Sequence, residues 1–203
     1  MADTKAAPAQ KEALARGDAL LVIDVQNDFI PGGSLAVPRG DEVVPALNRC
    51  IAAFSAAGLP VVATRDWHPA DHCSFTARGG PWPVHCVAGT HGAEFVRGLA
   101  LPATATLISK DTDRDRNTYS GFADTDLAAR LRAMGARRLF VGGLATDYCV
   151  LNTVRDALAL GFEVRLLGDA IRAVDVQPGD GARAQAEMIR LGATAITLDA
   201  LAA

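Results

Sequence analysis

Four residues with reactive side chains stand directly after short apolar runs of the sequence. Asp24 ends ALLVID, Asp66 ends PVVATRD and Lys110 ends ATLISK, while Cys149 follows RLFVGGL at the start of a helical stretch. Taken singly, each has an ordinary structural explanation, since such residues cap turns, lie in solvent or, for cysteine, pack in cores. If the runs are neighbouring parallel strands, however, these residues meet at one edge of a sheet.

A thiol beside a base and a positive charge suits nucleophilic catalysis. The unperturbed pKa of a cysteine is about 8.5, so a thiol needs a base or a cationic neighbour to attack a carbonyl near neutral pH. Asp24 can take the thiol proton and later pass it to a leaving group, while Lys110 adds a positive charge. If Thr146 caps the helix of TDYCVLNTVRDALALG, Cys149 lies in its first turn, where the helix dipole favours the thiolate. N–H groups of the turn VGGLAT and of Cys149 itself can hold an oxyanion.

The histidines form a second reactive group. All four lie within residues 68–91. His68 stands two residues after Asp66, on the same face of an extended segment, and His72 and His85 follow. One carboxylate and three imidazoles suit zinc, iron or manganese and leave positions open for water or substrate. We therefore predict one divalent metal ion held by Asp66, His68, His72 and His85.

Two other interpretations of this segment stay open. Cys73 and Cys86 directly follow His72 and His85, so a structural zinc site using those thiolates is one alternative. Ordinary histidines of a polar surface loop are the other. The spacing of the histidines alone does not decide among the three.

The apolar pattern predicts the elements that position these residues. Short β-rich runs alternate with longer stretches of helical spacing, most of which open near Asp or Thr and close on Gly. This alternation predicts an α/β fold, a three-layer α/β/α sandwich around a mostly parallel sheet of about six strands. The predicted strands are 19–24, 60–66, 105–110, 138–144, 163–169 and 194–198. The predicted helices are 41–58, 125–135, 146–161 and 179–192.

The segment 67–104 departs from this alternation. It is rich in Gly, Pro and His, as in WHPADHCSF and GGPWPVHC. Because loops of this length in a compact domain are usually functional, we expect it to contribute to the site.

Composition narrows the class of protein. A chain of 203 residues that is 50% hydrophobic can bury one core, so we expect a single domain over residues 18–203 after a flexible extension, residues 1–17. Acidic and basic residues are interleaved to a net charge of −3, which argues against nucleic-acid binding. The apolar runs are shorter than the ~20 residues of a membrane helix, and no export signal precedes them. We expect a cytoplasmic protein with reduced cysteines.

Five segments resemble the successive motifs of bacterial nicotinamidases, members of the isochorismatase-like cysteine hydrolases. They are LLVIDVQNDFIPGGSLAVP, VVATRDWHPADHCSF, WPVHCVAGTHGAEF, SKDTDRDRNTYSGF and VGGLATDYCVLNTVRDA, in the family's order. The resemblance covers about residues 19–198. It implies Asp24, Lys110 and Cys149 as a catalytic triad, and it implies the same four metal ligands. It also implies a cis peptide between Leu144 and Ala145, which aims the Ala145 N–H into an oxyanion hole shared with Cys149.

The resemblance implies a substrate as well. Phe29, Trp82, Tyr119 and Ala145 would line a pocket for the pyridine ring of nicotinamide, with the metal on the ring nitrogen. The implied reaction yields nicotinate and ammonia through a cysteine thioester, as a step of NAD salvage, and extends to pyrazinamide. Tyr148 departs from the histidine that related enzymes often have before the cysteine.

Three points stay open at the level of the sequence. Another hydrolase of the superfamily, acting on a carbamoyl amide or on isochorismate, is one alternative to nicotinamide hydrolysis. A non-catalytic zinc or redox thiol protein is another. The oligomeric state, monomer or homo-oligomer, is the third.

Overall fold

The computed structural model describes residues 11–202. Its main sheet has six strands in the order β4-β3-β2-β5-β6-β7, and every neighbouring pair is parallel. The strands are β2 (Asp18–Ile23), β3 (Val61–Asp66), β4 (Thr106–Lys110), β5 (Arg138–Leu144), β6 (Glu163–Arg172) and β7 (Thr194–Ile196). The α-helices are α1 (Val43–Ala56), α2 (Leu127–Ala133), α3 (Leu151–Ala159) and α4 (Asp180–Arg190). Short 3-10 turns cover Asn27–Phe29, Gly40–Glu42, Thr76–Arg78, His91–Ala93 and Leu198–Ala200. The predicted α/β class is confirmed.

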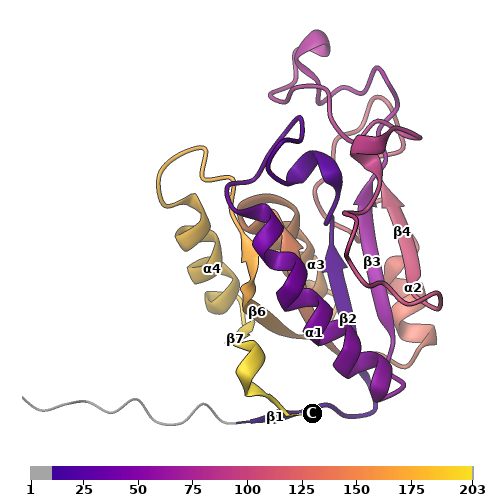
Figure 1. Cartoon of the computed structure of the whole chain (residues 1–203), viewed down its shortest axis with the longest axis vertical. Coiled ribbons are helices and arrows are strands. Elements are labelled where there is room, and N and C mark those ends of the chain that lie inside the picture. Colours follow the sequence, from indigo (N-terminus) through magenta and orange to yellow (C-terminus); the bar gives the residue numbers. More distant parts are fainter. Residues whose placement is uncertain (1–10, 203) are drawn as a thin grey trace, which may run out of the picture.

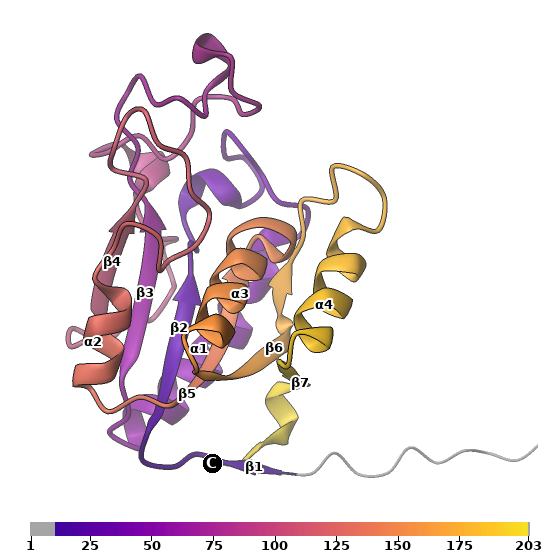
Figure 2. The ribbon, with the colours of Figure 1, turned by 180° about the vertical axis from the view of Figure 1, so that it is seen from behind.

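The helices cover both faces of the sheet. Helix α1 lies on one face and α2, α3 and α4 lie on the other (Figures 1 and 2). The cause is visible in β2, where every side chain is buried and successive side chains point to opposite faces. Leu20 and Val22 pack in the apolar cluster that includes α1, whereas Leu21 and Ile23 pack in the cluster that includes α3 and α4.

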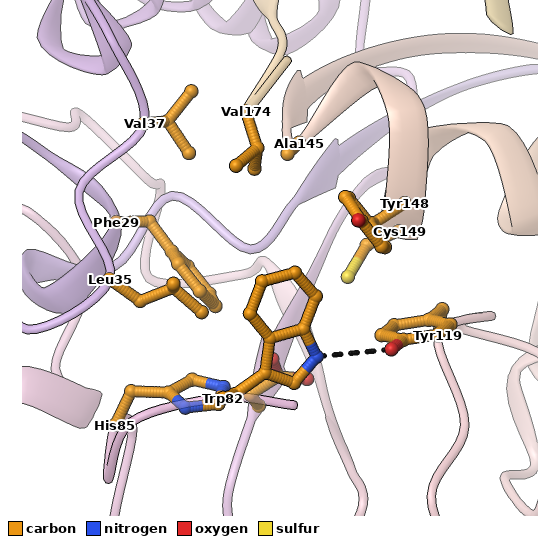
Figure 3. Close-up of a pocket in the computed structure, with 11 residues that line it drawn as sticks. Phe29, Leu35, Val37, Trp82, His85, Tyr119, Ala145, Tyr148, Cys149 and Val174 are labelled. Atoms are coloured by element: carbon orange, nitrogen blue, oxygen red, sulfur yellow. Dashed lines mark hydrogen bonds between the residues drawn. The ribbon is translucent and has the colours of Figure 1, made fainter. Parts of the chain in front are cut away.

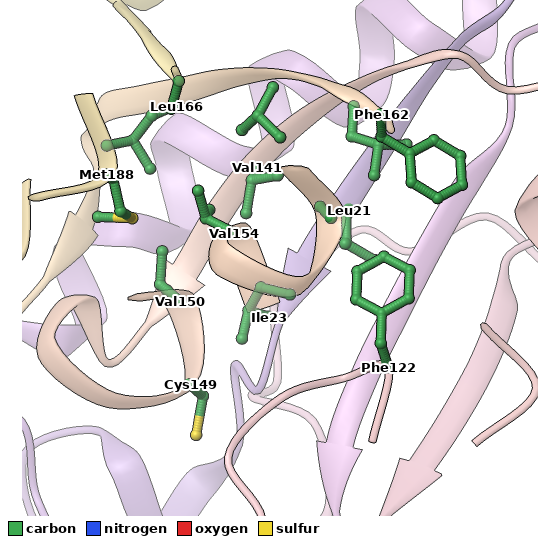
Figure 4. Packing of buried hydrophobic residues seen from close by; sticks show 14 of the residues in the cluster. Leu21, Ile23, Phe122, Val141, Cys149, Val150, Val154, Phe162, Leu166 and Met188 are labelled. Carbon is green, nitrogen blue, oxygen red and sulfur yellow. The ribbon is translucent and has the colours of Figure 1, made fainter. Parts of the chain in front are cut away.

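The second of these clusters reaches the edge where the strands end. Figure 4 shows Ile23, Val141 and Val154 packed together, with Cys149 at the end of the group and its sulfur directed away from it. The apolar core therefore holds the backbone of Cys149 in place. The sulfur itself is left at the boundary of the core, where a polar site can form.

Strand order reverses beside β2. The chain runs from β2 to β3 and β4 on one side, then returns to place β5 on the other side of β2. Gly143 makes the close approach possible, because its φ is 129° and an added Cβ would lie 2.1 Å from the backbone oxygen of Ile23. In open parallel sheets, ligands bind beyond the carboxyl ends of the strands at such a point. Here Asp24 follows β2 and Ala145 follows β5.

The N-terminal segment differs from the expectation of a loose extension over residues 1–17. Residues 1–10 lie outside the described part of the chain, but β1 (Glu12–Ala13) pairs in parallel with β8 (Leu201–Ala202). The Glu12 carboxylate lies 2.7 Å from guanidinium nitrogens of both Arg138 and Arg165. These ion pairs hold residues 12–13 against the domain, and a strand of two residues has no alternation that would reveal it in the sequence. Among the described helices, none is long and apolar enough to cross a membrane.

Candidate active site

Cys149 lies on an irregular turn rather than on a regular helix. The predicted helix 146–161 opens with a single π-helical turn, Thr146–Val150, before α3 begins. The peptide between Leu144 and Ala145 is cis, as predicted. Thr146 does not cap the helix: its hydroxyl is buried and has no hydrogen-bond partner among the described residues. The expectation of a Thr146 cap is therefore wrong.

The predicted triad comes together in a buried cluster. The Lys110 Nζ lies 3.2 Å from Asp24 Oδ2 and 3.5 Å from Cys149 Sγ. The other Asp24 oxygen accepts a hydrogen bond of 2.6 Å from the Thr64 hydroxyl. One carboxylate oxygen each of Asp24 and Asp66 and the Cys149 sulfur lie within 4.8 Å of one another. The structure thus places an acid, an amine and a thiol within reach of each other, out of contact with bulk water.

Burial decides the protonation states in this cluster. It raises the pKa of Asp24 to about 6, against the opposing charge of Lys110. Burial likewise raises the pKa of Cys149 well above its usual value, which Lys110 only partly offsets. For Lys110, burial disfavours the ammonium, but the carboxylates of Asp24 and Asp66 outweigh burial and hold its pKa well above the ordinary value. The predicted helix dipole favours a thiolate, whereas burial in the structure favours the protonated thiol, beside a carboxylate that can act as its base.

Two backbone donors lie at the predicted oxyanion position. Within residues 11–202, the N–H of Ala145 has no hydrogen-bond partner in the protein, and the N–H of Cys149 belongs to the π-helical turn Thr146–Val150. Both residues line the same pocket. An unpaired N–H group beside a nucleophile is a donor that an oxyanion requires, so Ala145 suits this role, and Cys149 as the second donor stays a prediction.

Three of the four predicted metal ligands form one cluster. Ligand atoms of Asp66, His68 and His85 lie within 4.8 Å of one another, and all three residues are buried. Neither ring nitrogen of His68 has a hydrogen-bond partner among the described residues, which is costly for a buried imidazole unless a ligand satisfies it. His85 directs Nδ1 at the Pro83 carbonyl, 2.8 Å away, which leaves Nε2 as the nitrogen with a free lone pair. Burial lowers the pKa of His85, which favours the neutral imidazole that binds metal. These residues fit a divalent ion.

The fourth predicted ligand stands apart from this cluster. The His72 ring packs beside that of His68, with 4.3 Å between centroids. However, its Nδ1 lies 2.8 Å from the Ser74 hydroxyl and its Nε2 lies 2.7 Å from the Arg116 carbonyl oxygen. The structure therefore does not bring a free nitrogen of His72 to the other ligands, and its role as a ligand stays a prediction.

The alternative site with cysteine ligands has no support in the geometry. Among the described residues, neither Cys73 nor Cys86 belongs to a group of metal-binding side chains. All four cysteines are free. Cys86 is fully buried, and burial raises its pKa well above the usual value, which disfavours the thiolate that zinc requires.

A small aromatic pocket opens above the thiol. It has about 360 Å³ of space not filled by atoms, including its mouth, and the four predicted pocket residues Phe29, Trp82, Tyr119 and Ala145 all line it. Figure 3 shows the Cys149 sulfur directed into this space. The aromatic lining suits a flat ring.

The aromatic residues of the pocket support one another. Trp82 Nε1 donates a hydrogen bond of 3.0 Å to the Tyr119 hydroxyl (Figure 3). Tyr148 packs edge-on against both, with ring centroids 5.0 Å from Trp82 and 5.3 Å from Tyr119. Tyr148, the residue that departs from related enzymes, is thus part of the pocket wall. Sequence reasoning did not assign three other lining residues, Leu35, Val37 and Val174.

A family model described as the isochorismatase domain matches residues 18–200. The chain belongs to the isochorismatase family. Among the members of this family, the nicotinamidase of Escherichia coli (strain K12) is 42% identical over 201 residues, covering 89% of this chain and 94% of the relative. The resemblance that the sequence motifs indicated is therefore confirmed.

Solved structures of the isochorismatase fold agree. The pyrazinamidase of Pyrococcus horikoshii in complex with zinc is 50% identical, with a TM-score of 0.86 over 89% of this chain and 99% of the other. PnC1 from L. infantum in complex with nicotinate is 37% identical, with a TM-score of 0.87 over 95% of this chain and 98% of the other. One of these neighbours holds a metal ion and the other a pyridine carboxylate.

In this isochorismatase domain, Gln26 holds the backbone of the predicted metal ligand Asp66, a contact that the sequence did not predict. Its amide is fully buried and faces the end of β3. Gln26 Oε1 accepts the Asp66 N–H at 2.8 Å, while Nε2 donates to the carbonyl oxygens of Asp66 at 2.8 Å and Ala93 at 2.9 Å. The side chain thus holds the backbone of Asp66 as a neighbouring strand would. The only signal in the sequence is a polar residue two positions after Asp24.

Gln26→Met is expected to lower the free energy of unfolding by about 3 kcal/mol or more, because it leaves three buried backbone groups without partners at about 1–3 kcal/mol each. Urea unfolding measures the change. Asn48→Leu is the matched control, since the Asn48 amide also bridges two backbone groups, Gly98 O and Ala100 N, but near solvent. We expect a loss below about 1 kcal/mol for the control. Equal losses for the two variants would contradict a special role of Gln26.

Proposed function

We propose that this enzyme is a metal-dependent amidase that hydrolyses nicotinamide to nicotinate and ammonia, and also accepts pyrazinamide. The observation that carries the proposal is a buried thiol, Cys149, beside a carboxylate and an ammonium at the floor of a small aromatic pocket. The names of the relatives support the substrate class. We propose Asp24, Lys110 and Cys149 as the catalytic residues.

In the first half of the reaction, Asp24 accepts the proton of the Cys149 thiol, and the sulfur attacks the carboxamide carbon. The carbonyl oxygen becomes an oxyanion, held by the N–H groups of Ala145 and Cys149. When the tetrahedral intermediate collapses, the C–N bond breaks and Asp24 returns its proton to the departing nitrogen. Ammonia leaves and a thioester remains on the sulfur.

In the second half, Asp24 takes a proton from a water molecule, whose oxygen attacks the thioester carbon. The same N–H groups hold the second oxyanion. The C–S bond then breaks and Asp24 gives its proton back to sulfur, so that nicotinate is released and the thiol restored. Lys110 stays protonated throughout, because its pKa lies well above the ordinary value, and it stabilises the negative charge that moves between Asp24 and Cys149.

Asp66, His68 and His85 are the residues that would hold the metal ion, with His72 as a predicted fourth ligand. When bound, the ion supplies a Lewis-acidic anchor for the ring nitrogen of the substrate. The donor set suits zinc, iron or manganese. Residues of the chain orient the ring, with Phe29 and Trp82 both lining the pocket (Figure 3).

The test is ammonia release from nicotinamide by the purified protein, before and after chelation, and with zinc, iron or manganese restored separately. We expect release that is lost on chelation and recovered with at least one ion, because the chelator removes the anchor of the ring. Protein with Cys149→Ala gives the background. If no ammonia is released with any of the three ions, nicotinamide is not the substrate. Carbamoyl amides are then the next substrates to test.

The location and the partners of the enzyme are separate proposals. The substrate is the small-molecule partner that we propose. A cytoplasmic location, the lack of nucleic-acid and membrane partners and the oligomeric state stay predictions of the sequence.

A further inference from the structure

One wall of the pocket comes from a loop that sequence reasoning did not assign to the site. Val174 follows β6, and Figure 3 shows it beside Ala145 and Val37, across the pocket from His85 and Trp82. Its side chain is apolar and half-buried. The position of this side chain therefore sets how much room a ring has on that side.

The carboxylate of Asp147 holds the backbone of this loop. Asp147 Oδ1 accepts the N–H of Val174 at 3.0 Å, and Oδ2 accepts the N–H of Asp175 at 2.8 Å. Hydrogen bonds to an ionised acceptor are stronger than neutral ones, and two of them fix an orientation as well as a distance. Asp147 stands in the π-helical turn, two residues before Cys149. One carboxylate thus joins the turn of the nucleophile to the wall that Val174 forms.

The loop has two other contacts at this point: the Asp175 carboxylate accepts the N–H of Gly181 at 2.7 Å, and Val174 packs against the apolar cluster that includes α1. Within the described residues, the N–H groups of Val174 and Asp175 bond only to Asp147. The next residue, Val176, is 54% exposed, so packing does not hold the chain there. Asp175 adopts a φ of 53°, a conformation that a non-glycine residue keeps only when its surroundings hold it. Without Asp147, the backbone of Val174 and Asp175 loses both hydrogen bonds that hold it toward the pocket, and the wall can shift.

We infer that Asp147 is a specificity-determining residue. It positions Val174 as the wall that excludes pyridine rings with an additional substituent. The inference rests on the proposed function and deepens it. Asp147 does not line the pocket and acts through the Val174 backbone. Its removal should widen the pocket while leaving the groups that perform the chemistry in place.

The experiment compares nicotinamide with nicotinamides that carry a methyl group at ring position 4, 5 or 6. For Asp147→Ala we expect KM for nicotinamide to rise about tenfold with little change in kcat, since uniform binding is lost. The wild-type preference for nicotinamide over at least one methylated analogue, measured as a ratio of kcat/KM, should fall about tenfold or more, the effect of one methyl group in a tight pocket. Asp147→Asn, which keeps the shape of the side chain, serves if the alanine variant does not fold.

Val174→Ala is a second variant measured in the same way, and it should lower the same preference for nicotinamide. The double variant Asp147→Ala with Val174→Ala should lower this preference no further, because both changes act on one wall. Asp180→Asn is the matched control: Asp180 Oδ2 also accepts a loop N–H, that of Gln177 at 2.8 Å, but lies away from the pocket. We expect this control to keep the wild-type preference.

The outcomes separate this inference from the proposed function. An active Asp147 variant with an unchanged preference, or additive effects in the double variant, would overturn the role of Asp147 and leave nicotinamide hydrolysis intact. A loss of kcat in the same proportion on every substrate would also overturn it, since that pattern indicates damage to the nucleophile. A wild-type protein that releases no ammonia from nicotinamide would overturn both.

Discussion

Replacing Cys149 by alanine is expected to abolish nicotinamide hydrolysis, with a loss of at least about 10⁴-fold in kcat. Cys149 is the only cysteine that lines the pocket within the described residues, and without its sulfur no thioester can form. Ammonia release measures the loss. In the wild-type enzyme, added hydroxylamine should capture the acyl group as a hydroxamate, and the alanine variant should yield none.

The fold should tolerate this substitution. Cys149 lies at the end of its apolar cluster with the sulfur directed away, so its removal leaves little cavity in the core (Figure 4). Cys50→Ala is the matched control, because Cys50 is an equally buried thiol, in α1, whose pKa burial raises to about 12. We expect this control to retain activity. A Cys149→Ala enzyme within tenfold of the wild type would refute nucleophilic catalysis by this residue.

The sequence predicted most reliably the features that appear as a regular pattern of apolar side chains or as a polar residue at the end of an apolar run. The short apolar runs predicted each strand of the main sheet to within a few residues, because both faces of a parallel sheet are buried and its strands are continuous apolar runs. Asp24 and Lys110 could be paired in advance for a related reason: each ends such a run, and parallel topology brings those ends to one edge. The cis peptide and the aromatic pocket came instead from the resemblance to a family.

The remaining parts of the site depend on contacts between residues far apart in the chain, which produce no recognisable pattern in the sequence. Gln26 and Asp147 act through hydrogen bonds to backbone groups 40 and 27 or 28 residues away, and nothing about a lone glutamine or aspartate predicts its partner. The same holds for His72, whose two nitrogens meet Ser74 and the Arg116 carbonyl. The rise in the pKa of Cys149 depends on its burial, which a sequence near a helix start does not reveal.

Lys110→Met is expected to have the second largest effect, on stability as well as on turnover. The Lys110 ammonium is fully buried and lies against three carboxylates, those of Asp24, Asp66 and Asp111. Methionine fills similar space but leaves these carboxylates buried without a cation. Removing one partner of a buried ion pair costs about 3–5 kcal/mol of unfolding free energy. Since Lys110 also lies 3.5 Å from Cys149 Sγ, we expect kcat to fall by about 10²-fold or more.

Arg65→Met is the matched control for Lys110→Met. It removes a positive charge from the same sheet, but not one that lies beside the thiol. Arg65 precedes Asp66 in β3, so its side chain points to the opposite face, where it stacks 3.7 Å from the centre of the Trp67 ring and donates to the Ser109 hydroxyl. It is partly exposed, and its loss should cost about 1 kcal/mol or less and leave kcat unchanged. Urea unfolding and ammonia release, measured on both variants, test the comparison. If Lys110→Met proves as stable and as active as Arg65→Met, the buried ammonium holds neither the carboxylates nor the thiol. In that case the charge that moves between Asp24 and Cys149 must be stabilised by the backbone donors alone.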